Sequence, residues 1–358
     1  MLIYGIVLCG SLAICYLFGE RHRRLCAFSI GIFMAIMAFN MDVHPSSDLN
    51  RYYYYLDFFR EMTWSECWLF SIVSNNPIHY ISLLLCSRLP NNQLYTAIIT
   101  FIDYFLIIKL IGNVCDDRAL NKRYYLSSIL FVLLNLNFFL VSNVIRIFLV
   151  FVVFFYCLYE ESVRKRHKVI CWIVYVVLVF YHYAMILLVV ARIFAAFMKS
   201  TLTRRGFAYK IFIVLLAIAG CIILFRTSLG GYITDKIIDY SDYSVRGTWQ
   251  TIMGTIQFIM VGTMLFFAPN DLELGIKSYK LTIVALFIIN LLSLNNYQMI
   301  LRFGNAMVIS SPVLHMYLYK SNDNCNALNR LRIFEFVNCV GTLIVFTYTM
   351  VYYYHTFL

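Results

Sequence analysis

Four arginines stand beside long apolar runs that otherwise lack charge: Arg146, Arg226, Arg246 and Arg302. A guanidinium at the edge of an apolar segment loses hydration unless it reaches the water interface or binds an anion. Its planar fork of N–H donors matches phosphate oxygens in a bidentate way. Several such groups at one face would therefore form a phosphate or pyrophosphate site. Each arginine taken alone is about as well explained by a side chain that extends to lipid headgroups.

Two of these arginines lie near the starts of predicted helices. Arg146 follows a predicted outer turn, and Arg302 occupies an equivalent place before a late apolar run. A helix start favours anions because its backbone N–H groups and its dipole are positive. Gly304, close to Arg302, would let another backbone or a ligand approach. Arg226 and Arg246 flank a long predicted outer loop.

Three further residues suit proton transfer or sugar binding. His182 lies at a predicted outer turn between two short apolar segments, where it could accept a proton from a sugar hydroxyl. The alternative is a neutral histidine that is hydrogen-bonded to a carbonyl at a broken helix. Asp48 and Arg51 belong to the first large outer loop, whose carboxylate could act as a base or bind sugar hydroxyls. Loop aspartates also form turns and caps, and nothing in this loop fixes metal geometry, so we expect no metal site.

Asp103 falls in the middle of an apolar run, which is an expensive place for a carboxylate. It is either functional or a structural hydrogen-bond acceptor. The chain contains no phosphate-binding glycine loop, dinucleotide fingerprint, nucleophile elbow or zinc-protease motif. We therefore expect no cofactor and no ATP-driven mechanism.

Composition places these residues in a membrane protein. Of the 358 residues, 62% are hydrophobic and only 13% are charged, and the mean hydropathy is +0.76. We predict a single all-α integral membrane domain over residues 1–358. Its twelve predicted spans are 2–18, 25–41, 92–112, 124–140, 144–160, 169–181, 183–198, 207–225, 250–267, 281–294, 303–319 and 334–355.

One further apolar segment, 69–89, is interrupted by Asn75, Asn76 and Pro77. We predict that it re-enters the membrane from the outer side instead of crossing it. With that choice, most lysines and arginines fall in loops on one side, which the positive-inside rule assigns to the cytoplasm. The candidate site then faces the periplasm or exterior. The net charge of +11 is explained by these loops beside anionic lipid, so no nucleic-acid partner is expected.

The order of several features resembles the EpsG/Wzy-like polymerases of bacterial O-antigen and exopolysaccharide over nearly the whole chain. The shared features are an outer loop with Asp48 followed by aromatics, a short motif before a brief helix, arginines that open two spans, and a histidine followed by a small residue. In this chain they are Asp48, Tyr52, Tyr55, Asn76-Pro77-Ile78-His79-Tyr80, Arg146, His182, Ala184 and Arg302. The chain has Ile147 where the family usually has Gln.

The resemblance implies a multi-span glycosyltransferase of the GT-C-like type in the cytoplasmic membrane. Such an enzyme transfers a growing glycan from undecaprenyl pyrophosphate to a new lipid-linked repeat unit. It would contact membrane lipids, and a chain-length regulator protein is a candidate partner. Arg146 and Arg302 would then bind pyrophosphate, and Arg226, Arg246 and Arg51 would bind phosphate or sugar. Either His182 or Asp48 would be the base.

Three other functions fit the same sequence. An O-antigen ligase would use the same donor with a lipid A-core acceptor. A flippase or exporter of lipid-linked oligosaccharide would line a cavity with cations and change no covalent bond, but such transporters usually contain repeated halves, and none is found here. A membrane acyltransferase would be expected to carry a buried histidine on the donor side.

Overall fold

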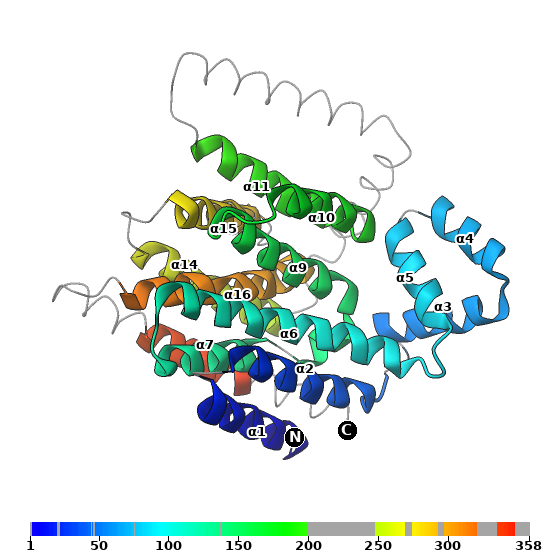
Figure 1. Cartoon of the computed structure of the whole chain (residues 1–358), viewed down its shortest axis with the longest axis horizontal. Coiled ribbons are helices and arrows are strands. Elements are labelled where there is room, and N and C mark those ends of the chain that lie inside the picture. Colours follow the sequence, from blue (N-terminus) through cyan, green and yellow to red (C-terminus); the bar gives the residue numbers. More distant parts are fainter. Residues whose placement is uncertain are drawn as a thin grey trace, which may run out of the picture.

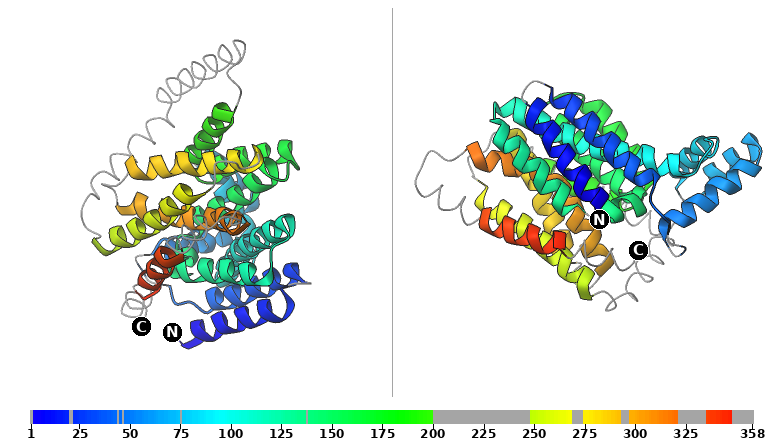
Figure 2. Two further views of the ribbon diagram at one scale, coloured as in Figure 1. Left: turned by 90° about the vertical axis from the view of Figure 1, so that its left-hand side faces the viewer. Right: turned by 90° about the horizontal axis from the view of Figure 1, so that it is seen from below.

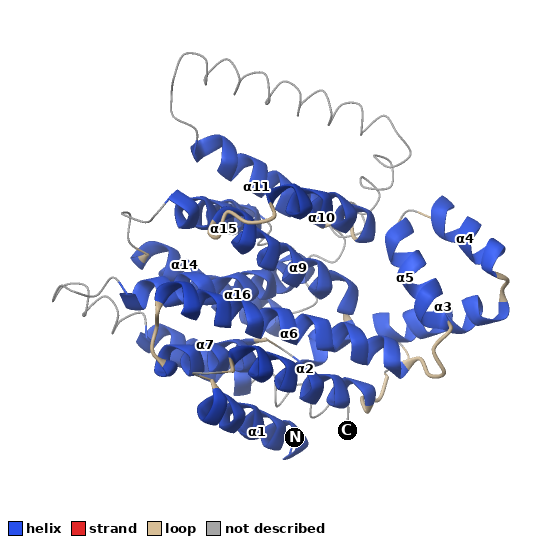
Figure 3. Ribbon diagram, in the orientation of Figure 1, coloured by secondary structure: helices blue, strands red, loops and turns tan. Residues whose placement is uncertain are grey.

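A computed structural model describes residues 2–19, 22–43, 45, 47–74, 76–136, 138–199, 248–268, 274–292, 297–320 and 335–347. Every regular element in these ranges is a helix, which confirms the predicted all-α class (Figure 3). The helices are α1 Leu2–Phe18, α2 Arg23–Phe39, α3 Asp48–Glu61, α4 Trp64–Val73, α5 Pro77–Ser87, α6 Gln93–Arg118, α7 Lys122–Asn135, α8 Phe138–Asn143, α9 Ile145–Ser162, α10 Lys168–Tyr181, α11 Met185–Lys199, α14 Thr248–Phe267, α15 Leu274–Leu292 and α16 Tyr297–Lys320. A further helix covers Glu335–Thr347.

Helix α6 runs through the middle of the bundle (Figures 1 and 2). It packs most extensively against α2 and also contacts α9 and α16. Gly31 of α2 permits this close packing, because a Cβ built there would come within 3.0 Å of the Phe101 ring. With 26 residues, α6 is about 39 Å long at ~1.5 Å per residue. It therefore joins the two ends of the bundle.

We predicted about twelve membrane spans, but most of the helices are too short or not apolar enough to count as full spans. Within the described ranges only α6 is both long and apolar enough to cross a membrane by these criteria. Several predicted spans correspond to shorter helices, and α15 carries Lys277 and Lys280 within it. The predicted span 124–140 divides into α7 and α8, and the predicted span 207–225 lies outside the described residues.

The segment predicted to re-enter from the outer side forms two short helices, α4 and α5, instead of one long helix. Pro77 occupies the first turn of α5, where a missing N–H costs nothing. The ends of this unit are tied together, because Arg60 of α3 donates to the carbonyl oxygen of Ser87 and Arg88 donates to that of Met62. The chain thus enters and leaves the α4–α5 hairpin at the same place.

Large apolar side chains face outward on many helices. Val73 of α4, Val169 of α10 and Phe266 of α14 are 77%, 73% and 83% exposed. In α4 the inward side carries only Cys67 and Ser71, which are both buried. Small residues at the packing face with large apolar residues outside are the reverse of the usual pattern in water.

Polar groups occupy the interior of the bundle. Arg192 of α11 and Glu161 of α9 are buried and form a two-point ion pair, with 2.6 Å from Nη2 to Oε1 and 3.1 Å from Nε to Oε2. Tyr175 of α10 donates to the same carboxylate, and Ser278 of α15 accepts from Arg192. This network connects four helices.

Helices α14 and α16 cross at two glycines. A Cβ built on Gly304 would lie 3.4 Å from the Cα of Gly254 and 2.7 Å from Oε1 of Gln257. The expected close approach at Gly304 is therefore made by the backbone of α14. Because Gly304 follows Arg302 by two residues, this crossing fixes the position of that arginine on α16.

Candidate functional site

Five side chains from five separate elements gather at the end of the bundle where α3 and α5 join it. We call them the outer cluster: Tyr52 of α3, His79 of α5, Arg146 of α9, His182 between α10 and α11, and Arg302 of α16. The ring of His79 meets the ring of Tyr52 edge to face, with centroids 5.3 Å apart. His182 is under the electrostatic influence of Arg146, Arg302 and His79. Residues that are up to 250 positions apart in sequence thus share one site.

Arg146 is the centre of this cluster. It acts electrostatically on Tyr52, His79 and His182. Its Nε is buried and has no hydrogen-bond partner among the described residues. It also lies in the first turn of α9, whose N-cap residue Val144 provides no side-chain cap. A guanidinium N–H and uncapped helix amides at one place favour an anionic ligand.

His182 ends α10 and begins the turn into α11. Its backbone N–H donates to the carbonyl oxygen of Leu178, and its Nδ1 accepts from the N–H of Ala184 at 3.1 Å. Burial holds the pKa of His182 well below its ordinary value, and the positive charges of Arg146 and Arg302 lower it further. The imidazole is therefore neutral at physiological pH.

Positive charge prevails around Tyr52. Burial raises the pKa of Tyr52 above its ordinary value, so the phenol keeps its proton. Three arginines act on it against a single carboxylate; they are Arg146, Arg51 and Arg302, and the carboxylate is Asp48. An excess of fixed positive charge at a partly buried site is suited to an anion such as pyrophosphate.

The remaining predicted site residues are placed differently. Asp48 is the first residue of α3 and forms an ion pair with Arg51 at 2.9 Å, so both lie at the border of the outer cluster. That pairing occupies part of the carboxylate that was considered as a base. Arg226 and Arg246 lie outside the described residues.

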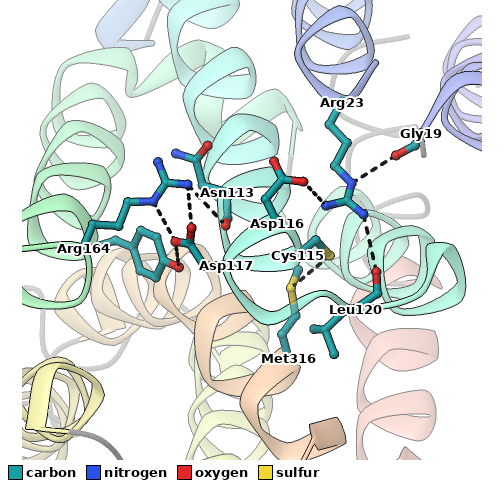
Figure 4. Close-up of polar contacts among 10 residues, drawn as sticks. Gly19, Arg23, Asn113, Cys115, Asp116, Asp117, Leu120, Arg164 and Met316 are labelled. Atoms are coloured by element: carbon teal, nitrogen blue, oxygen red, sulfur yellow. Dashed lines mark hydrogen bonds and ion pairs between the residues drawn. The ribbon is translucent and has the colours of Figure 1, made fainter. Parts of the chain in front are cut away.

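The opposite end of the bundle presents a contrast (Figure 4). There Arg164 binds Asp117 with two hydrogen bonds, 2.7 Å from Nε to Oδ2 and 3.0 Å from Nη2 to Oδ1, and also reaches Glu160 at 3.0 Å. Arg23 forms an ion pair with Asp116. We call these residues the ion-pair cluster. Arg164 and Arg23 at this end are paired with carboxylates of the chain, whereas Nε of Arg146 at the other end has no hydrogen-bond partner among the described residues.

Two residues of the site carried no chemical role in the sequence analysis. His79 was quoted only as part of a motif, and Tyr181, whose ring lies 5.3 Å from that of His79, was not considered. A histidine that follows Asn76-Pro77 in an apolar segment is the signal that pointed to this position.

Asp103 is fully buried, and neither of its carboxylate oxygens has a hydrogen-bond partner among the described residues.

A comparison with protein-family models finds no match, and comparisons with curated proteins and with solved structures find no significant similarity either.

Proposed function

We propose that the protein is a polytopic membrane glycosyltransferase that joins oligosaccharide repeat units carried on undecaprenyl pyrophosphate. The observation that carries this proposal is the outer cluster, in which Arg146 and Arg302 lie beside a neutral histidine. Arg146 also has a buried N–H without an acceptor. A pyrophosphate group would supply that acceptor.

The membrane environment is supported by the outward apolar faces of α4, α10 and α14 together with the buried ion pair of Arg192 and Glu161. In water, such outward faces would drive association, whereas lipid is their natural solvent. Several helices that are shorter than a full span would then cross with the help of their capping turns and of local bilayer thinning. The outer cluster would face the periplasm or exterior of a cytoplasmic membrane.

The chemistry follows from the leaving group. A glycan linked to undecaprenyl pyrophosphate is already activated, because pyrophosphate departs readily when its developing charge is neutralised. Arg146 and Arg302 would provide that neutralisation, and Tyr52 would add a neutral phenol as a hydrogen-bond donor. Neither a nucleotide sugar nor ATP is required for transfer.

A gene deletion followed by gel analysis of surface polysaccharide separates this function from its rivals. A polymerase defect leaves a single capped repeat. A ligase defect leaves no capping, and a flippase defect traps intermediates on the cytoplasmic side. Either of the last two patterns would contradict the polymerase proposal.

Reconstitution provides the direct test. Purified protein in nanodiscs should extend undecaprenyl-pyrophosphate-linked repeats without nucleotide sugar, ATP or added divalent metal. The opposite outcome is a strict requirement for a divalent ion, with activity abolished both by EDTA and by Asp48→Ala. That outcome would move the centre of the site from the arginines to the first outer loop.

A further inference from the structure

Two buried nitrogen atoms in the outer cluster have no hydrogen-bond partner among the described residues: Nδ1 of His79 and Nε of Arg146. Arg146 acts electrostatically on His79, so the two groups belong to one site. Buried polar atoms are almost always paired, and a pair of neighbours without partners points to a missing ligand. The guanidinium requires an acceptor, and an unprotonated imidazole nitrogen requires a donor. A pyrophosphate oxygen and a sugar hydroxyl together would meet both needs.

The hydrogen bond at His182 decides which histidine can take a proton. A neutral imidazole has one nitrogen with a proton and one with a lone pair. Because Nδ1 of His182 accepts from the backbone N–H of Ala184, its lone pair is occupied and the proton resides on Nε2. His182 therefore presents an N–H donor to the site and lacks a free lone pair.

Nδ1 of His79 has no hydrogen-bond partner among the described residues, so its lone pair is free when the ring carries its proton on Nε2. His79 is 1% exposed, and its ring is held edge to face by Tyr52 and by Tyr181, with centroid distances of 5.3 Å in both cases. These contacts fix the ring without occupying Nδ1. Burial holds the pKa of His79 well below its ordinary value, and the positive charges of Arg146 and Arg51 lower it further. An arriving pyrophosphate would offset their charge and so make His79 a stronger base.

We propose that His79 is the general base of the transfer and that His182 is a hydrogen-bond donor to the leaving group; this rests on the proposed function. The acceptor hydroxyl gives its proton to Nδ1 of His79, and its oxygen forms a bond to the anomeric carbon of the donor glycan. The bond between that carbon and the pyrophosphate oxygen breaks, and the electron pair leaves with the pyrophosphate. Arg146 and the Nε2–H of His182 stabilise the new charge. His79 then releases its proton to water.

Isosteric substitutions separate the two roles. Asn places an amide near the position of Nδ1, and Gln places one near Nε2, but neither is a base. Purified protein in nanodiscs is assayed for turnover of lipid-linked repeats and for binding of undecaprenyl pyrophosphate. His79→Asn and His79→Gln should both lower turnover by about 100-fold or more, with little change in binding. His182→Gln, which keeps an N–H donor near Nε2, should lower turnover clearly less than the His79 variants do, whereas His182→Asn should weaken binding about tenfold.

The outcomes separate this assignment from the function itself. Near wild-type turnover in both His79 variants would overturn the assignment and leave the proposed function intact. A loss in His182→Gln as large as in the His79 variants would return the role of base to His182. If the His79 variants fail to fold, as judged by size-exclusion chromatography, the turnover of His182→Gln relative to the wild type still tests the assignment. A wild-type protein that neither binds undecaprenyl pyrophosphate nor extends repeats would overturn the proposed function, and the assignment with it.

Discussion

The guanidinium of Arg192 holds the carboxylate of Glu161 by two hydrogen bonds inside the bundle, where both side chains are buried. A charge without its partner at this depth is costly, because each ion has lost its hydration. The pair therefore constrains how α9 and α11 pack.

Breaking this pair should destabilise the protein strongly. We expect Arg192→Met to lower the free energy of unfolding by roughly 3–5 kcal/mol, since it leaves Glu161 as a buried unpaired charge. The double variant Arg192→Met/Glu161→Leu should recover much of that loss, because both charges are gone. Thermal unfolding followed by intrinsic fluorescence in nanodiscs measures both. A double variant that is less stable than the single variant would contradict this account.

Arg146 and Arg302 should be needed for donor binding. We expect Arg146→Ala and Arg302→Ala each to weaken undecaprenyl pyrophosphate binding by roughly 10–100-fold, because a charge-assisted hydrogen bond is lost. Lys at either position should restore binding only in part, since it lacks the planar fork. Arg24→Ala is the matched control, because Arg24 is an exposed arginine next to Arg23 of the ion-pair cluster, far from the outer cluster. Full binding by both Ala variants would rule out a pyrophosphate clamp.

The lowered pKa of His182 predicts how stability depends on pH. The unfolded chain protonates this residue near the ordinary pKa of about 6.5, whereas the folded protein resists protonation. Stability is therefore complete above about pH 6.5 and decreases as the pH falls below it, by at most about 1.4 kcal/mol per pH unit for one histidine. Melting temperatures from pH 8 to pH 5 measure this trend. His182→Gln should reduce the slope, and an unchanged slope would show that other groups control it.

The two ends of the bundle should be accessible from opposite sides of the membrane. Asn50 of α3 is exposed beside the outer cluster, and Arg166 is exposed beside the ion-pair cluster. We expect an impermeant maleimide to label Asn50→Cys in intact cells and Arg166→Cys only after the membrane is opened. These variants are made in a background without other exposed cysteines. Labelling of both sites in intact cells would disprove the topology.

The crossing of α14 and α16 should control the outer cluster at a distance. Gly254→Val should force the helices apart, because even a Cβ at Gly254 would collide with Ile300, and should cost about 1–3 kcal/mol of stability. It should also weaken pyrophosphate binding by displacing Arg302, although Gly254 itself touches no ligand. A matched control is Gly5→Ala, since open space surrounds that position. Unchanged binding by Gly254→Val would separate the crossing from the site.

The helical class could be predicted from the sequence. The sequence also drew attention to Arg146, Arg302 and His182, because polar groups in apolar surroundings are conspicuous, and in the structure the two arginines act electrostatically on His182. It could not show that Asp48 is paired with Arg51, since an i,i+3 pair forms only if α3 is helical at that point. The role of His79 was also beyond it. That role depends on which lone pair is free, and the decisive hydrogen bond joins Nδ1 of His182 to the backbone N–H of Ala184, two residues later and far from His79 in the sequence.

Helix boundaries were harder to predict than helix existence. Residues 124–140 read as one continuous apolar run, but α7 ends at Asn135, whose side chain bonds to Thr342 from a distant part of the chain. Such a contact leaves no trace in local hydropathy. Most predicted segments coincide with helices, but several of these helices are shorter than a membrane span, so the predicted number of full spans was too high.

The closed base of the α4–α5 hairpin has a consequence for how the fold can vary. Arg60 and Arg88 hold its entrance and exit together, so the chain leaves the hairpin at the same place at which it enters. Shortening or exchanging its outer turns would leave the orientation of every later helix unchanged. His79 stands near the start of α5 and would move with any such exchange. A related chain could therefore carry a different hairpin, and with it a different residue in place of His79, without a change in the bundle behind it.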